Sequence, residues 1–153
     1  MAQFMAPSWI QPSAGFRSRK AAQICAYFAT QSEGTIEKLK LIKMIYLAER
    51  KYLFAHHHPM LFDEFYSLPH GPICSSTLNG INGTLGDSFW DEYIARNGNI
   101  VVAVKAVARD DLDEISDAEM AVIEEVWEEF SKMTASQIRN YTHDNCSEYT
   151  ETD

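Results

Sequence analysis

The side chains able to perform acid–base or metal chemistry gather in two short segments. His70 and His143, with Asp63 and Asp144, would form a general acid/base or metal site if these segments met in space. A metal-dependent hydrolase that uses His70 and His143 is therefore one hypothesis. The chain has no HExxH or HxxEH zinc motif and no GxSxG nucleophile elbow. These absences favour a structural role for His143, which would hold the C-terminal segment to the core through a hydrogen bond.

Three consecutive histidines, His56, His57 and His58, precede Pro59. Consecutive helical residues point about 100° apart, so three adjacent imidazoles cannot converge on one ion while the helix is intact. At a helix C-terminus, a protonated imidazole instead interacts favourably with the helix dipole. We therefore expect neither a bound metal ion nor another cofactor.

The cysteines allow a second kind of chemistry. Cys74 follows His70 by four residues and Cys146 follows His143 by three, so either thiol is a candidate nucleophile. Cysteine is also among the most frequently buried residues, and Cys74 stands beside the apolar Ile73. We expect burial rather than catalysis, and hence a protein that is not an enzyme. Three widely spaced cysteines without a CxxC pair fit a reducing cytoplasm.

Length and charge narrow the class of partner. The 153 residues fit a single domain. The 22 acidic and 13 basic residues give a net charge of −9 at pH 7, which makes nucleic acid an unlikely ligand and attracts basic partners. We expect neither a signal peptide nor a membrane contact, because the chain has no apolar run of about 18 residues and the N-terminus lacks a basic segment followed by an apolar one.

Hydrophobic periodicity and turn residues predict a fold that is α+β but predominantly α-helical. Ser18, Thr35, Ser116 and Thr134 are the expected helix starts. The expected helices cover residues 18–30, 36–55, 72–79, 117–133 and 134–141. A strand is expected at 65–68, and an antiparallel hairpin joins 90–96 to 100–107 through Asn97-Gly98. This order predicts one compact domain at 18–143, with an N-terminal arm at 1–17 and an acidic tail at 144–153.

The long helix at 36–55 has one face whose composition is mixed. Apolar residues cover more than half of its circumference, so we expect it to be central. The remaining arc holds Lys40, Lys43, Arg50 and Lys51, but also Met44 and Leu47. A solvated face, a partner-binding site and a second core layer under the N-terminal arm each explain this arc. Met44, Leu47, Lys40 and Lys43 are therefore candidate partner-binding residues.

A tight turn supplies the other candidate surface. Pro69, His70, Gly71 and Pro72 follow the expected strand and force the chain to reverse. Such a turn serves either as a rigid corner between two elements or as a recognition loop on a rigid scaffold. Both interpretations stay open.

Three blocks in this order resemble the Panacea domain of SocA-like antitoxins. They are KLKLIKMIYLAERKYLFAHHHPM at 38–60, FDEFYSLPHGPICSSTLNGI at 62–81 and MTASQIRNYTHDNCSEY at 133–149. The first is similar to the family's long helix, the second to its strand and Gly-Pro turn, and the third to its closing Thr-His block. The family often has a tryptophan near the position of Tyr149, so this chain departs from the pattern there.

The resemblance implies a protein that works by binding. Its expected partner is a cognate toxin protein, which it would neutralise by direct contact. The second implied partner is a cytoplasmic protease to which it would deliver the toxin. A prophage-type interaction module of another purpose is the alternative, followed by the hydrolase built on His70 and His143.

Overall fold

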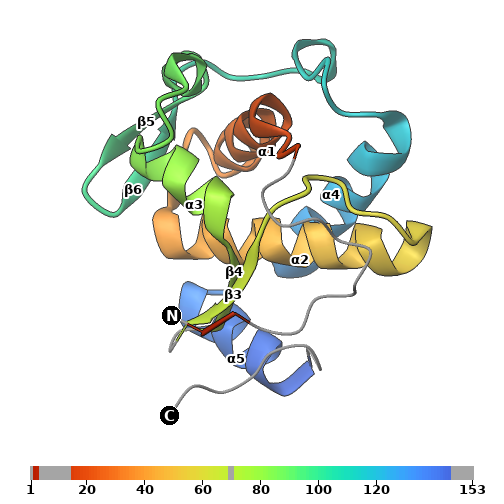
Figure 1. Cartoon of the computed structure of the whole chain (residues 1–153). Coiled ribbons are helices and arrows are strands. Elements are labelled where there is room, and N and C mark those ends of the chain that lie inside the picture. Colours follow the sequence, from red (N-terminus) through yellow and green to blue (C-terminus); the bar gives the residue numbers. More distant parts are fainter. Residues whose placement is uncertain (1, 4–14, 69–70, 146–153) are drawn as a thin grey trace.

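A computed structural model describes residues 2–3, 15–68 and 71–145 of the chain. The helices of this part surround one central helix, α2, with α1, α4 and α5 packed around it (Figure 1). Their bounds are α1 Ser18–Gln31, α2 Lys38–His56, α3 Ser75–Asn82, α4 Asp117–Phe130 and α5 Ala135–Asn145, with short 3₁₀ turns at Ser88–Glu92 and Arg109–Asp111.

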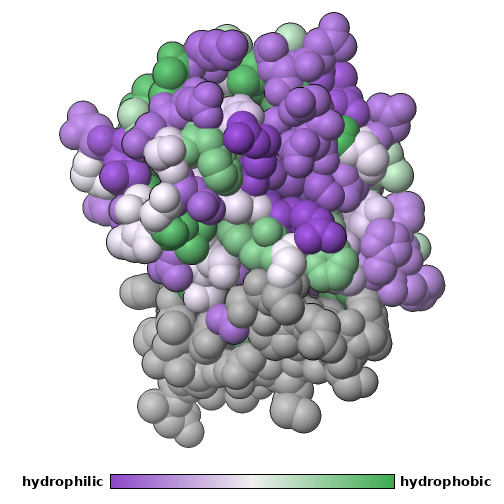
Figure 2. Space-filling view, turned by 45° about the horizontal axis from the view of Figure 1, so that its top comes forward, coloured by the Kyte–Doolittle hydropathy of each residue, from purple (hydrophilic) through white to green (hydrophobic). Residues whose placement is uncertain are grey.

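Two small antiparallel sheets complete the domain. Their strands are β1 Ala2–Gln3, β2 Thr35–Glu37, β3 Phe65–Leu68, β4 Gly71–Cys74, β5 Ile94–Asn97 and β6 Ile100–Ala103. One sheet has the order β1-β3-β4 and the other β2-β6-β5. The predominantly helical α+β class predicted from the sequence is confirmed. Hydrophilic side chains cover much of the described surface in Figure 2, with smaller hydrophobic patches between them.

The long helix is central, as predicted, but it begins two residues later than expected. Thr35–Glu37 forms β2 and pairs with β6, with Ile36 buried between two exposed neighbours. Gly34 precedes this strand with φ of +97°, a conformation that glycine adopts without strain. The alternation of burial and the glycine turn favour a strand, so the prediction that Thr35 caps the long helix was wrong.

Pro72 also has a different role from the one predicted. It lies in β4 opposite Ser67, and α3 begins only at Ser75. β4 is an edge strand of its sheet, where the missing N–H of proline costs little. The donors of the first helical turn are instead satisfied by Asp63, which accepts from the N–H groups of Ser76 at 2.7 Å and Thr77 at 2.9 Å.

The predicted hairpin is present with shorter strands. Asn97 pairs with Ile100, so Gly98 and Asn99 are the central turn residues, one position after those predicted. Gly98 has φ of +61°, as the first central position of a type II′ turn requires. Trp90 lies in a 3₁₀ turn before the hairpin rather than in its first strand.

The C-terminal helices begin where the sequence indicates. Ser116 and Glu119 form a reciprocal capping box at α4, with N···O distances of 2.9 and 3.2 Å. Thr134 and Gln137 do the same at α5, at 2.8 and 3.1 Å. Ser18, in contrast, does not cap α1 and instead joins Asp87 to the indole of Trp90. Helix α5 extends to Asn145, past the predicted end near Tyr141.

Replacing Gly80 by alanine should destabilise the domain. An alanine Cβ would lie 2.2 Å from Cζ2 of Trp90, which is buried and held by its hydrogen bond to Ser18. Overpacking costs about 1–3 kcal/mol, which exceeds the gain of roughly 1 kcal/mol in helix propensity. Urea unfolding measures the difference, with Asn79→Ala on the exposed side of α3 as the control. A Gly80→Ala protein as stable as the control would contradict this packing.

Candidate partner-binding groove

The mixed arc of α2 is covered along its N-terminal half. Lys43 and Met44 have no exposed surface, and the Nζ of Lys40 donates to the carbonyl oxygen of Ser131 at the end of α4. Burial, and to a smaller extent the nearby positive charge of Arg139 on α5, lower the pKa of Lys43 to about 8. This half of the arc therefore belongs to the packing between α2, α4 and α5.

Of the four candidate residues on α2, Lys43 and Met44 are thus too deeply buried to form part of a docking surface. Met44 is fully buried and Leu47 is only 5% exposed, so both are part of the hydrophobic core. The described elements packed over this part of α2 are α4 and α5, and a partner cannot touch Met44 or Lys43 in this fold. Most of the N-terminal arm, which in one interpretation forms a second core layer here, lies outside the described residues. Lys40 is half-buried and engaged with Ser131.

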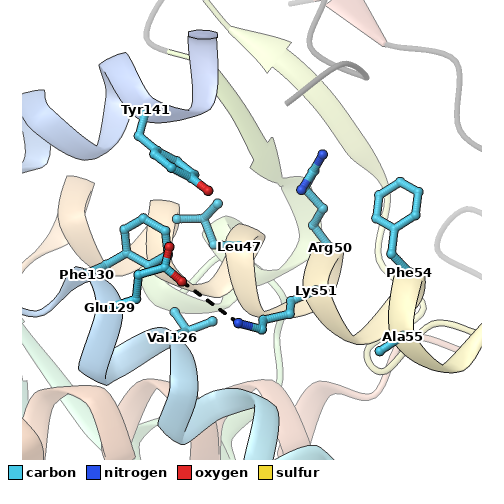
Figure 3. Close-up of a pocket in the computed structure, with 9 residues that line it drawn as sticks. All are labelled: Leu47, Arg50, Lys51, Phe54, Ala55, Val126, Glu129, Phe130 and Tyr141. Atoms are coloured by element: carbon cyan, nitrogen blue, oxygen red, sulfur yellow. Dashed lines mark ion pairs between the residues drawn. The ribbon is translucent and has the colours of Figure 1, made fainter. Parts of the chain in front are cut away.

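The C-terminal half of the same arc is open and forms a groove between α2, α4 and α5 (Figure 3). Its volume is about 560 Å³. Figure 3 shows Tyr141 of α5 pointing toward Leu47 and Phe130, while Arg50 and Phe54 stand along the opposite side. We call this feature the α2–α4–α5 groove. Its lining residues are Leu47, Arg50, Lys51, Phe54, Ala55, Val126, Glu129, Phe130 and Tyr141.

The groove combines an apolar floor with a charged rim. Leu47, Val126 and Phe130 are buried and come from the facing sides of α2 and α4. The Phe130 and Tyr141 rings meet edge to face with centroids 4.9 Å apart, which connects α4 to α5. An apolar floor surrounded by polar groups is the usual anatomy of a protein-binding site.

Phe54 is the most exposed large hydrophobic residue among those described, at 58%. The Arg50 guanidinium lies over its ring at 5.0 Å from the centroid. On the other side of the groove, the Nζ of Lys51 is 3.0 Å from Glu125 and 3.9 Å from Glu129. The exposed ring therefore lies at the mouth of the groove beside Arg50, and the groove also holds the Lys51–Glu129 ion pair.

Glu49 fixes the segment that follows α2 against the side of this helix. This fully buried carboxylate accepts the N–H groups of Met60 at 2.6 Å and Leu61 at 2.7 Å, which fixes the segment after the helix against it. Burial raises the pKa of Glu49 to about 7, against the opposing effect of these two hydrogen bonds. The carbonyl oxygens of the same segment accept from Lys20 and from the N–H of Arg17 at the start of α1.

Asp63 and Cys74, two other residues considered for chemistry, have structural positions in the core. Asp63 is buried, and its oxygens accept from Glu64, Ser76 and Thr77, so it caps α3. Cys74 is buried, and desolvation, with the charges of Asp63 and Glu49, raises the pKa of its thiol well above its usual value. A buried thiol with a raised pKa is a poor nucleophile at neutral pH.

The histidines of the described part lie apart from one another except at the end of α2. There His56 stacks on Tyr52 with centroids 4.4 Å apart, and His58 meets the same ring edge to face. Exposed His143 lies on α5, 3.5 Å from the carboxylate of Asp144. Within residues 2–3, 15–68 and 71–145, no three His, Cys, Asp or Glu side chains form a cluster able to hold a metal ion.

The roles predicted for the Pro69–Pro72 turn and for His143 remain predictions. Pro69 and His70 lie outside the described residues, as do most of the N-terminal arm and residues 146–153. Gly71 and Pro72 form the start of β4. Any pairing of His70 with His143 is therefore also outside what the structure describes.

Comparison with known proteins identifies the family. The model of the SocA-like antitoxin family, the Panacea domain, matches residues 41–148, which is most of the chain. The chain belongs to this family. No curated protein and no solved structure matches it significantly. No helix in the described part of this Panacea domain combines the length and apolar character needed to cross a membrane.

Sequence reasoning missed Phe54 as a site residue of this Panacea domain, although a signal was present. Phe54 follows Leu47 by seven residues, or two helical turns, and so continues the apolar intrusion into the charged arc. The sequence placed Val126 and Phe130 on the apolar face of one expected helix and Tyr141 at the end of the next. Periodicity does not show which parts of an apolar face stay uncovered where helices diverge.

Aspartate substitutions should separate the covered half of the arc from the open half. Met44→Asp should lower the free energy of unfolding by more than about 3 kcal/mol, because a carboxylate would be buried in the core. Phe54→Asp should change it by only about 0.5 kcal/mol, because the side chain is exposed. Urea unfolding followed by circular dichroism measures both. Equal stability of the two variants would place Met44 at the surface.

The free energy of unfolding should fall as the pH rises through 7. The pKa of Glu49 is about 7 in the folded chain and near 4.5 when unfolded, so the folded state binds this proton more tightly. Glu49 therefore stabilises the fold fully at a pH below its pKa in the unfolded chain, and this stabilisation is lost as the pH rises through its pKa in the folded chain. Urea unfolding between about pH 5 and pH 8 should show a steeper fall for the native protein than for Glu49→Gln, which does not titrate. If the unfolding free energies of the native protein and of Glu49→Gln depend on pH in the same way, groups other than Glu49 cause the fall.

Proposed function

We propose that this Panacea domain is an antitoxin that neutralises a cognate protein toxin by direct binding in the α2–α4–α5 groove. The observation that carries the proposal is the exposed Phe54 ring at the mouth of an apolar groove, within a chain of an antitoxin family. Aromatic residues beside buried apolar floors are the usual energetic centres of protein interfaces.

The proposed mechanism is steric. An apolar side chain of the toxin would enter the groove and contact Leu47 and Phe130, while Arg50 and Lys51 would lie at the rim. The bound antitoxin would then cover the toxin's active surface or hold it inactive. The groove is preformed, since its floor consists of core residues, and a preformed site loses little conformational entropy on binding.

Delivery of the toxin to a cytoplasmic protease is a separate step within this proposal. It would use a different surface, because a groove filled by the toxin cannot hold a second partner. A cytoplasmic location is consistent with the free, buried thiols of Cys25 and Cys74 in the described part of the chain.

Co-expression with the product of the neighbouring gene tests the proposal. The native chain should restore growth that this product prevents when it is expressed alone. Phe54→Asp should abolish the rescue, because an interface carboxylate must be desolvated without a partner. Val104→Asp is the matched control: Val104 is 52% exposed, close to the 58% of Phe54, and does not line the groove.

Both variants should accumulate as folded protein, which circular dichroism verifies. Loss of rescue in both variants, or in Val104→Asp alone, would place the toxin contact outside the groove. Failure of the native chain to rescue growth from any candidate toxin would reject the antitoxin function itself.

A further inference from the structure

The exposed side of α4 carries two parallel rows of glutamates. Glu125 and Glu129 are four residues apart, so they share one face of the helix, and both approach Lys51 at the groove. Glu124 and Glu128 form the second row. Together with burial, their charges raise the pKa of the Tyr27 phenol, and Glu124 lines a hollow beside Tyr27, which places this row toward α1.

The exposed side of α4 is therefore negative. Four exposed carboxylates lie along this helix, and the two at the groove, Glu125 and Glu129, form ion pairs with Lys51. The second of its two contacts is long, at 3.9 Å, and the Glu129 side chain is 46% exposed. Both Glu125 and Glu129 can accept further hydrogen bonds from a cationic ligand at the groove margin.

The walls of the groove also indicate the shape of its occupant. Helices α2, α4 and α5 bound it on three sides, and the floor side chains come from two of them. A further helix laid along such a groove completes a helical bundle and buries one apolar stripe against the floor. Residues spaced three and four apart on that helix would reach Leu47, Phe54 and Phe130.

We propose that the groove binds a basic amphipathic helix of the toxin, whose apolar stripe covers Phe54 and whose lysines or arginines pair with Glu125 and Glu129. This rests on the proposed function and names the chemistry of its partner. A second copy of this chain fits less well, because two molecules of charge −9 repel each other. The phosphates of a nucleic acid would meet the same negative side of α4.

A synthetic helical peptide of about five turns, made of leucine on one face and lysine on the other, is the probe. Its binding to the native chain is followed by fluorescence anisotropy at about 0.15 M salt, where distant charges are screened. A peptide with glutamate in place of lysine is the first control. We expect the lysine peptide to bind and the glutamate peptide to bind at least about tenfold more weakly.

Two double variants of equal charge locate the contact. Glu125→Gln with Glu129→Gln removes the row at the groove, and Glu124→Gln with Glu128→Gln removes the row facing α1. The first double variant should weaken binding about tenfold. The second should weaken it less than about threefold, because salt screens the attraction between the peptide and carboxylates that it does not contact. Phe54→Ser, which removes the apolar ring without adding a charge that would attract lysine, should weaken binding as strongly as the first double variant does.

Equal weakening by the two double variants would show binding to the overall negative charge and would overturn the proposal. Tighter binding of the glutamate peptide, or undiminished binding by Phe54→Ser, would do the same. The growth assay separates this result from the proposed function. If the groove-facing double variant still rescues growth but Phe54→Asp does not, the antitoxin binds in the groove and its partner segment is not basic.

Discussion

Helix α2 is buried along nine consecutive residues, Leu41 to Glu49, so it has no solvent-facing side over more than two turns. A helix in that position must satisfy its polar side chains inside the protein. Glu49 does so by accepting two main-chain N–H groups from the segment after the helix, through hydrogen bonds of 2.6 and 2.7 Å. Much of the remaining structure depends on this junction, because the same segment also receives Lys20 and Arg17 from α1 and leads through Asp63 to the cap of α3.

The groove is a consequence of this arrangement. α5 covers the first half of the charged arc of α2, where Lys43 and Met44 are buried, and leaves the second half open. The core supplies the floor of the groove, and the exposed last turns of α2 supply Phe54. A surface built on the most buried element of a domain is rigid, and rigidity lowers the entropic cost of binding a partner.

The sequence predicts the helices and the capping boxes of α4 and α5 well, because capping boxes and the 3.6-residue period are local signals. The caps expected at Ser18 and Thr35 were wrong. It predicts β2 and β4 poorly, because Thr35–Glu37 and Gly71–Cys74 become strands only through pairing with distant segments. The charged arc was recognised as unusual from Met44 and Leu47. Which half of the arc is covered depends on the placement of α5, more than 80 residues away in the sequence, and periodicity carries no information on that contact.

Photo-crosslinking from a single position tests most directly whether a toxin binds in the groove. A photoreactive phenylalanine analogue at position 54 should form a covalent adduct with the co-expressed toxin, and the same analogue at position 104, on another exposed site, should form none. Mass spectrometry of the adduct would also identify the toxin segment that contacts the groove. An adduct formed from position 104 and not from position 54 would contradict binding in the α2–α4–α5 groove.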